Sequence, residues 1–242
     1  MRGIAIPVRS DTGFGSLARD HIFGKYLGIP YKPLWHEYFN DFDNGVEFNN
    51  ITDTLTWGIT NTGTGTIATQ DGDGGELLLT NAAADNDLLF VQKVGESFKY
   101  AAGSVLGFGA RFKVSDATQS DFVIGLMITD TTLLDVTDGI FFQKDDGDAD
   151  LDFHVEKDNT ATDAAAIHTV VADTFLTVQW LYDPTDAKIY YGVNGVVKGS
   201  LALTNVPDDE ELTISFGIQN GEAVAKTMTL DWILGFKWMN RS

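Results

Sequence analysis

The stretch 212–219, LTISFGIQ, decides the fold, because apolar side chains stand at every second position along it. Leu212, Ile214, Phe216 and Ile218 would share one face of an extended chain, and the residues between them are polar or glycine. Alternation of this kind is typical of a strand with one buried face. The sequence therefore predicts a half-buried strand of an antiparallel sheet at this position.

Further stretches of the chain repeat this pattern. In 107–114, GFGARFKV, and in 121–128, DFVIGLMI, apolar residues again occupy alternate positions. The last stretch, 228–238, is expected to place the following residues together on one apolar face: Met228, Leu230, Trp232, Leu234, Phe236 and Trp238. Several such strands in one chain favour a layered β-structure over an isolated hairpin.

The connections between these stretches carry turn-forming residues. Asn194-Gly195 separates two strand-like runs and is the signature of a two-residue type I′ hairpin. The segment 183–186, DPTD, is a second turn, in which the proline fixes φ. About a dozen or more short strands can be counted with no long helical pattern, which is the layout of a sandwich or jelly roll. The predicted fold class is all-β, an antiparallel two-sheet β-sandwich.

Composition limits the partners. The chain has 242 residues, no cysteine and a formal net charge of −19, so it can bury a large core but can form no disulfide or thiolate site. Most of its acidic residues lie after residue 40, and such a body repels phosphate backbones, so we expect no nucleic-acid partner.

No stretch reaches the roughly 18 apolar residues of a membrane span. The first residues do not resemble a signal peptide, and we expect neither secretion nor a membrane partner.

Residues 1–38 differ from the rest of the chain and are expected to form an N-terminal arm, followed by a β-domain over 39–242. A short helix is predicted over 16–27, with Ser16 as N-cap and Gly28 as the stop, between extended segments. The arm is too apolar for a solvated tail, so it packs either on its own domain or on a partner. The residues expected to carry docking on a partner are Ile4, Ile6, Val8, Arg9, Phe14, Arg19, Phe23, Tyr26 and Trp35.

Several segments follow one another in the order of a known family. They are FNDF (39–42), LTW (55–57), GFGARFKV (107–114), DFVIGL (121–126), DGIFF (138–142), KIYYGVNG (188–195) and LDWI (230–233). This order resembles the concanavalin A-like lectin and glucanase jelly roll, in the laminin-G-like form common in phage genomes. The resemblance covers most of the chain after the arm and implies a jelly-roll β-sandwich; the arm has no counterpart in it.

The resemblance also implies a setting, because many proteins of this kind in tailed phages are virion components. We therefore expect a non-enzymatic structural protein of a bacteriophage virion, most simply a capsid decoration (cement) protein. Its partner would be the major capsid protein or another virion protein, contacted through the arm. It would be a homo-oligomer, for instance a trimer at a three-fold position of the capsid. The alternative is a carbohydrate- or receptor-binding module of a phage fibre or tail.

No catalytic signature accompanies the resemblance. Glucanases of this fold carry a Glu-x-Asp-x-x-Glu strand that supplies a nucleophile and an acid, and this sequence lacks that motif. The nearest stretch is 150–156, DLDFHVE, whose Asp150, Asp152, His154 and Glu156 would share one face. That face is an ordinary solvated one unless it lines a cleft and holds a perturbed carboxylate. With no Gly-x-Ser-x-Gly elbow and no phosphate-binding loop either, we predict that the protein is not an enzyme.

Two acidic loops, 71–76 and 145–150, offer hard oxygen ligands at short spacing. Neither fits the EF-hand register, and solvated acidic turns are the simpler interpretation. Laminin-G-like domains, however, often bind calcium near the rim of the sandwich. We expect no cofactor, and name Asp71, Asp73, Asp146 and Asp148 as calcium candidates.

Sugar binding requires exposed aromatic side chains with amide or acid partners. By residue type alone the candidates are Trp57, Tyr182, Tyr190 and Tyr191. Each of them fits a role in the core or in sheet packing at least as well. The sequence alone therefore predicts no sugar site.

Overall fold

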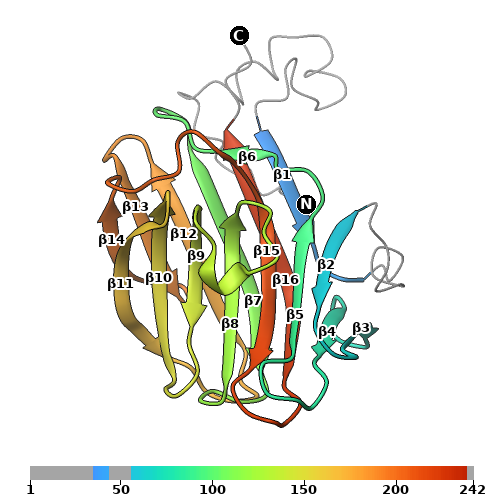
Figure 1. Cartoon of the computed structure of the whole chain (residues 1–242). Coiled ribbons are helices and arrows are strands. Elements are labelled where there is room, and N and C mark those ends of the chain that lie inside the picture. Colours follow the sequence, from blue (N-terminus) through green and yellow to red (C-terminus); the bar gives the residue numbers. More distant parts are fainter. Residues whose placement is uncertain (1–34, 44–55, 239–242) are drawn as a thin grey trace, which may run out of the picture. The chain divides into compact units, whose positions relative to one another are not determined.

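The computed structural model describes residues 35–43 and 56–238 (Figure 1). Within these residues the elements are strands, apart from one 3₁₀ turn, η1, at Leu133–Asp135. The all-β prediction is confirmed, whereas the helix predicted over 16–27 lies outside the described residues. No helix in the described part of the chain is long and apolar enough to cross a bilayer.

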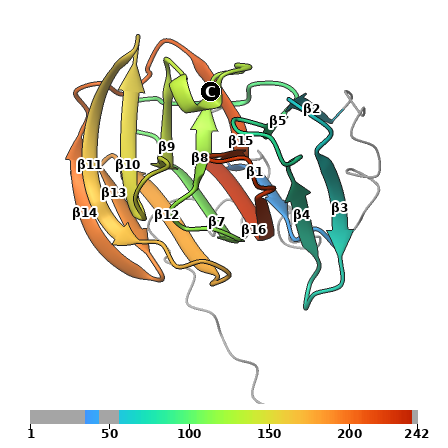
Figure 2. The same ribbon diagram turned by 60° about the horizontal axis from the view of Figure 1, so that its bottom comes forward.

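The strands form two sheets that lie face to face (Figure 2). The sheet at the rear of Figure 1, called the back sheet, has the order β14 (Val196–Ala202), β13 (Lys188–Val193), β12 (Leu176–Asp183), β7 (Leu106–Val114), β16 (Thr227–Trp238), β4 (Glu76–Thr80) and β3 (Thr66–Gln70), with β1 (Trp35–Asn40) also pairing with β16.

The front sheet has the order β11 (Thr160–Thr169), β10 (Asp150–Lys157), β9 (Gly139–Lys144), β8 (Ser120–Met127), β15 (Glu211–Asn220), β5 (Leu88–Lys93) and β2 (Trp57–Asn61), with β6 (Phe98–Lys99) also pairing with β15. The strand pairings within 57–238 are antiparallel. The predicted two-sheet antiparallel sandwich is therefore confirmed.

The core lies between the two sheets and is rich in aromatic side chains. Phe112 of β7 and Phe122 of β8 meet edge to face across the interlayer space, with ring centroids 5.2 Å apart. Phe153 of β10 stacks on Tyr191 of β13 at 4.8 Å. Each such buried ring contributes about 1.5–3 kcal/mol from the area it removes from water. Contacts of this kind join the sheets, since the backbone hydrogen bonds run only within each sheet.

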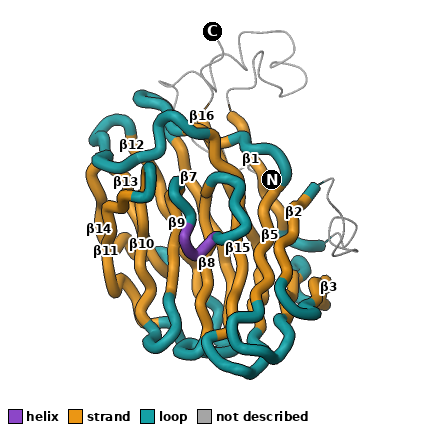
Figure 3. The backbone as a smooth tube through the Cα atoms, viewed as in Figure 1, coloured by secondary structure: helices purple, strands orange, loops and turns teal. Residues whose placement is uncertain are grey.

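The outer face of the front sheet differs from the sequence prediction. Thr213 and Ser215 of β15, expected to face solvent, are fully buried. A second apolar cluster covers this face and includes Leu133 and Val136 of the segment after β8. Figure 3 shows the backbone of this segment, with the 3₁₀ turn η1, crossing over the front sheet. The buried hydroxyls are satisfied locally, since Thr213 Oγ1 donates to the carbonyl oxygen of Lys93 at 2.7 Å. The central strands are thus buried on both faces.

The hairpin predicted at Asn194-Gly195 is confirmed. Asn194 has φ 52° and Gly195 has φ 76°, and both positive angles are those of a type I′ turn. Val193 pairs with Val196 across the turn. The side chain of Asn194 also accepts a hydrogen bond of 2.8 Å from the backbone N–H of Thr177, which fixes the hairpin to the neighbouring strand.

The chain divides into two units, and the sandwich is the unit Glu37–Lys237. The predicted boundary at residue 38 falls inside β1, which begins at Trp35. Trp35 is the one proposed docking residue whose backbone is described. The other docking residues, Ile4, Ile6, Val8, Arg9, Phe14, Arg19, Phe23 and Tyr26, lie outside the described residues, and their docking role stays a prediction.

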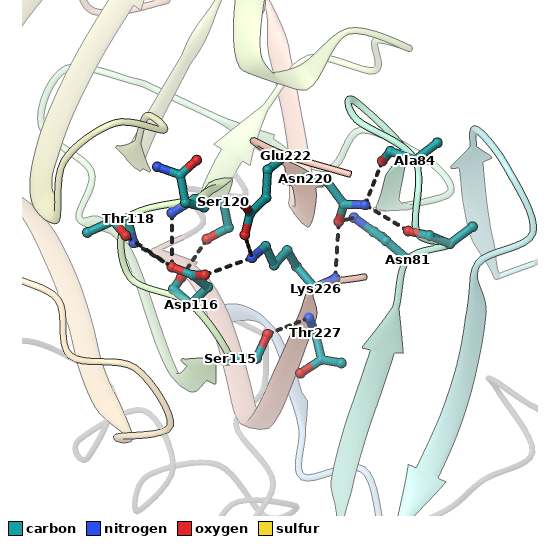
Figure 4. A network of polar contacts seen from close by, with 12 residues as sticks. Asn81, Ala84, Ser115, Asp116, Thr118, Ser120, Asn220, Glu222, Lys226 and Thr227 are labelled. Atoms are coloured by element: carbon teal, nitrogen blue, oxygen red, sulfur yellow. Dashed lines mark hydrogen bonds and ion pairs between the residues drawn. The ribbon is translucent and has the colours of Figure 1, made fainter. Parts of the chain in front are cut away.

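A polar network closes the end of the sandwich where the β7–β8 loop meets the β15–β16 hairpin (Figure 4). Lys226 is only 3% exposed. Its Nζ lies 2.7 Å from Asp116 Oδ2 and 2.6 Å from Glu222 Oε1. The carboxylates compensate the charge of a nearly buried ammonium, which would otherwise be strongly unfavourable.

Asn220 extends this network to the β4–β5 loop (Figure 4). Its Nδ2 donates to the carbonyl oxygens of Ala82 at 2.7 Å and Ala84 at 2.8 Å. Its Oδ1 accepts from the backbone N–H of Lys226 and from Nδ2 of Asn81, each at 3.1 Å. One buried side chain thus joins the β4–β5 loop to the β15–β16 loop at this end of the molecule.

Candidate functional site

A groove with a volume of about 570 Å³ lies on the outer face of the back sheet. It crosses β13, β12, β7 and β16, so that no single segment of sequence contains it. The lining side chains that bear on its chemistry are Gln179, Leu181, Asp183, Asp186, Tyr190, Trp232, Leu234 and Phe236.

Strand register explains why this part of the sheet is hollow. One row across the four strands consists of Tyr190, Leu181, Gly107 and Phe236. The next row consists of Gly192, Gln179, Gly109 and Leu234. Neighbouring strands lie about 4.8 Å apart, so each row is about 14 Å long. Three of these eight positions are glycine, so neighbouring groups can lie close to the backbone there.

Aromatic rings lie over the glycine positions of β7. A Cβ atom added to Gly107 would lie 2.5 Å from Cζ of Phe236, and one added to Gly109 would lie 3.3 Å from Cζ3 of Trp232. The two rings therefore rest against the β7 backbone in space that a larger residue would take. Both side chains remain partly exposed, so the groove offers ring surface to a ligand.

A β-bulge turns these aromatic residues outward. The register of β16 with β7 shifts between Leu230 and Trp232, at Asp231. Before the bulge Leu230 is buried in the core, and after it the buried residue is Ile233. The expectation that Trp232, Leu234 and Phe236 share the core face with Met228 and Leu230 is therefore wrong, because one extra residue reverses the alternation.

The β12–β13 turn supplies polar groups at one end of the groove. Tyr190 donates from Oη to Oδ2 of Asp186 at 2.6 Å, and this hydrogen bond raises the pKa of the tyrosine. Asp183 Oδ1 accepts from the backbone N–H of Thr185 at 2.8 Å, which fixes the turn. Each of these carboxylates has a second oxygen that can accept further hydrogen bonds.

Cationic side chains occupy the same face of the sheet further along β7. Arg111 forms an ion pair with Asp231, and its guanidinium lies 4.1 Å from the ring centroid of Phe175. Lys113 lies over the same ring at 4.5 Å. These cations are held by a carboxylate and an aromatic ring, and they do not line the groove.

Of the aromatic residues considered for sugar binding, the structure places only Tyr190 in a position to meet a ligand through its side chain. Trp57, Tyr182 and Tyr191 are 9% exposed or less and belong to the core. The sequence missed Trp232 and Phe236 because alternation placed them inside. The sequence does carry one sign that some of these side chains face outward. The run of apolar and aromatic residues on β16 is too long for one buried face.

The polar face expected on 150–156 is present on the outside of β10. His154 Nδ1 lies 2.8 Å from Asp163 Oδ1 on β11, and its ring stacks on Phe141 at 5.1 Å. Asp152 Oδ1 accepts from the backbone N–H of Ala166 at 2.6 Å. Burial raises the pKa of Glu156, yet neither this groove nor the second cavity described below includes a β10 residue.

The calcium candidates lie at two separate places. Asp71 lines a shallow cavity of about 410 Å³, and Asp73 is exposed nearby. Asp146 and Asp148 are exposed in the β9–β10 loop. In the described ranges, no group of three or more His, Cys, Asp or Glu side chains is arranged to hold a metal.

A lysine accompanies the second acidic loop. Lys144 is 1% exposed, and its Nζ donates to the carbonyl oxygen of Ser120. Burial lowers the pKa of Lys144, while the nearby charges of Asp121 and Asp148 favour its protonated form. A buried lysine side chain therefore lies beside the acidic β9–β10 loop.

No family model matches the sequence, and no curated protein matches it. Solved structures share its fold. A Shewanella oneidensis MR-1 protein of unknown function matches with a TM-score of 0.61 and 14% identity, over 89% of this chain and 93% of that one. An endo-1,3-beta-glucanase from Streptomyces sioyaensis matches with a TM-score of 0.59 and 14% identity, over 86% and 99%. The Emp46p carbohydrate recognition domain matches with a TM-score of 0.56 and 10% identity, over 81% and 94%.

These similarities define the class of fold. The chain is a concanavalin A-like jelly-roll sandwich, as the sequence resemblance implied, and its structural neighbours include both lectins and glucanases. At 10–14% identity the neighbours establish the fold alone, since one fold carries many functions. Nothing in them indicates a virion protein, so the virion and capsid predictions remain without support.

Proposed function

We propose that this protein is a non-catalytic carbohydrate-binding module, and that the groove on the back sheet holds the glycan. The observation that carries the proposal is the combination of partly exposed rings, Trp232 and Tyr190, with an exposed amide, Gln179, and two carboxylates in one depression. Sugar rings have apolar C–H faces and a rim of hydroxyls. A few fixed polar groups within an apolar lining are the usual composition of a small-molecule site.

The chemistry of the groove matches this ligand. The aromatic faces remove apolar C–H surface from water, and the carboxylates of Asp183 and Asp186 accept hydrogen bonds from hydroxyl groups. Charge-assisted hydrogen bonds of this kind are roughly twice as strong as neutral ones. The rigid sheet fixes all these groups before a ligand arrives, which reduces the entropy lost on binding. The carbohydrate recognition domain among the structural neighbours is consistent with this proposal.

The absence of catalysis is part of the proposal. Glycoside hydrolysis requires one carboxylic acid whose pKa is raised, beside a second carboxylate across the scissile bond. Among the carboxyl groups of the described residues, burial raises the pKa of Asp121 and of Glu156. Neither of them lines the groove.

The virion setting is a separate matter. A carbohydrate-binding module is the alternative that the sequence resemblance implied for a phage fibre or tail. Docking on a capsid through residues 1–38 rests almost wholly on residues outside the described ranges. We therefore propose glycan binding for the sandwich, and the partner and location stay predictions.

The test is glycan-array screening of the full chain, followed by calorimetric titration of the best ligand. We expect a dissociation constant below about 1 mM. Trp232→Ala should weaken binding by about tenfold or more, because the platform for the sugar ring is lost. Phe39→Ala is the matched control, since this aromatic side chain is 54% exposed and does not line the groove.

Two results would contradict the proposal. One is the absence of any glycan ligand at millimolar concentration, and the other is a ligand whose affinity Trp232→Ala leaves unchanged. Release of shorter sugars from the bound glycan would overturn the non-catalytic part alone. Thermal melting of each variant shows that the fold is intact.

A further inference from the structure

The charges around the groove point to the class of sugar. Asp183 and Asp186 line it, and no Lys, Arg or His is among its lining residues in the described part of the chain. Both carboxylates belong to the β12–β13 turn, so they lie together at one end. A ligand in the groove therefore meets negative charge and hydrogen-bond acceptors there.

The cations on the same face lie outside the groove, and one of them, Lys188, is the cross-strand partner of Asp183. Arg111 and Lys113 lie further along β7, away from the β12–β13 turn, and both contact the ring of Phe175. Arg111 is also paired with Asp231. A ligand carboxylate or sulfate would have to displace these contacts to reach Arg111 or Lys113, and near Lys188 it would lie beside Asp183 and Asp186.

The net charge of the whole chain also disfavours the binding of anionic ligands. A net charge of −19 repels polyanions over distances of the Debye length, about 10 Å at 0.1 M salt. Rejection of one partner by like charge is a common source of specificity. An uncharged sugar loses nothing by this, and an amine-bearing sugar gains.

Building on the proposed function, we propose that the groove selects glycans by charge. It accepts neutral sugar chains, binds amine-bearing chains more tightly through Asp183 and Asp186, and rejects chains that carry carboxylate or sulfate groups. Asp186 accepts a hydrogen bond from Tyr190, which orients its carboxylate at the rim. The selectivity thus resides in the β12–β13 turn, while ring stacking supplies affinity that is common to all three ligands.

The experiment titrates the full chain with three oligosaccharides of equal length and linkage, made of glucose, glucosamine and glucuronic acid. At about pH 6 the glucosamine amines are protonated. At low salt we expect glucosamine chains to bind about tenfold more tightly than glucose chains, and glucuronic acid chains to bind at least about tenfold more weakly. Both differences should shrink at about 0.5 M NaCl, where exposed charges are screened.

Two variants assign the effect to the turn. Asp183→Asn and Asp186→Asn preserve shape, and the amide oxygen can still accept from Tyr190. The readout is the ratio of affinities, since a lost carboxylate hydrogen bond weakens the binding of all three chains. Each variant should lower the affinity for the glucosamine chain relative to the glucose chain, and raise the affinity for the glucuronic acid chain relative to the glucose chain. Asp150→Asn is the matched control, since it removes the same charge at an exposed position on the front sheet that does not line the groove.

The outcomes separate the two proposals. If the glucuronic acid chain binds as tightly as the glucose chain at low salt, charge selection is wrong and glycan binding stands. If charge preference exists but both Asn variants retain it, the assignment to the turn is wrong. If none of the three chains nor any array glycan binds, the proposed function fails, and charge selection fails with it.

Discussion

Gly125, in the middle of β8, shows how little room the central strands leave at the level of one residue. An added Cβ would lie 2.5 Å from Cα of Phe141 and 2.6 Å from the carbonyl oxygen of Ile140, both on β9. These are backbone atoms of a buried strand and cannot move away cheaply. We expect Gly125→Ala to lower the free energy of unfolding by about 2–3 kcal/mol, measured by urea denaturation.

The control for this substitution is Gly58→Ala on the edge strand β2. There the nearest atom to an added Cβ is the carbonyl oxygen of Gln92 at 3.7 Å, an ordinary contact. The expected change is below about 1 kcal/mol. Equal losses in the two variants would show that crowding between β8 and β9 is not the cause.

Lys226 sets a second prediction at the residue scale, because it couples stability to pH through Asp116. Burial tends to raise the pKa of Asp116, but hydrogen bonds from Lys226 and from the backbone of Gln119 and Thr118 outweigh it and hold the pKa well below 3.8. The folded state therefore binds fewer protons than the unfolded state. This stabilisation is complete above about pH 5 and is lost as the pH falls through 3.8 and below.

Lys226→Met should remove the part of this coupling that Lys226 supplies, while the backbone hydrogen bonds to Asp116 remain. We expect a loss of about 2–4 kcal/mol at neutral pH, since two carboxylates lose a nearly buried partner. Between about pH 6 and pH 3 the variant should lose less stability than the wild type, because Asp116 then titrates nearer its ordinary pKa. Urea denaturation across this range measures both. Parallel pH profiles would contradict the coupling, and Lys198→Met, at an exposed position on β14, provides the control.

At the scale of elements, alternation predicted the strands well but not what covers them. In β7 the predicted pattern holds, with Phe112 and Val114 inside and Lys113 partly exposed. In β15 it fails on the outer face, because the segment carrying Leu133 and Val136 packs there. The alternation of apolar and polar residues depends only on neighbouring positions in the sequence. A loop that folds back over the sheet makes long-range contacts, and these do not alter the two-residue period of the strand.

The bulge at Asp231 carries a prediction of its own at this scale. Deleting Asp231 would remove the one extra residue and restore regular pairing of β16 with β7, with Leu230 and Ile233 still in the core and Trp232 still outside. We therefore expect a soluble, folded protein that loses no more than about 2 kcal/mol of unfolding free energy. Asp231→Asn keeps the chain length and removes only the charge from the pair with Arg111, a side chain that is 38% exposed, so its cost should stay below about 1 kcal/mol. An insoluble deletion variant would contradict the account of Asp231 as one extra residue between two correctly facing halves of β16.

At the scale of the whole molecule, the fold was predictable and the groove was not. Strand patterns and the Asn194-Gly195 turn carry the fold, because each is a local property of the chain. The groove instead joins Tyr190, Leu181 and Phe236 across strands that the sequence separates by up to 55 positions. Their meeting depends on strand order, on glycines in β7 and on the bulge. A site made by register between distant strands can be found only once that register is known.

The net charge of the molecule yields the last prediction. The chain holds 35 acidic and 16 basic side chains, so repulsion among carboxylates outweighs the few exposed ion pairs, such as Lys99 with Glu211. Exposed pairs contribute about 0–1 kcal/mol each, and salt weakens them as well. Because salt screens the more numerous repulsions, raising NaCl from about 0.02 M to 0.5 M should raise the melting temperature by a few degrees. The increase should nearly vanish near pH 4.3, the isoelectric point. A melting temperature that falls with salt at neutral pH would mean that attractive pairs govern the surface.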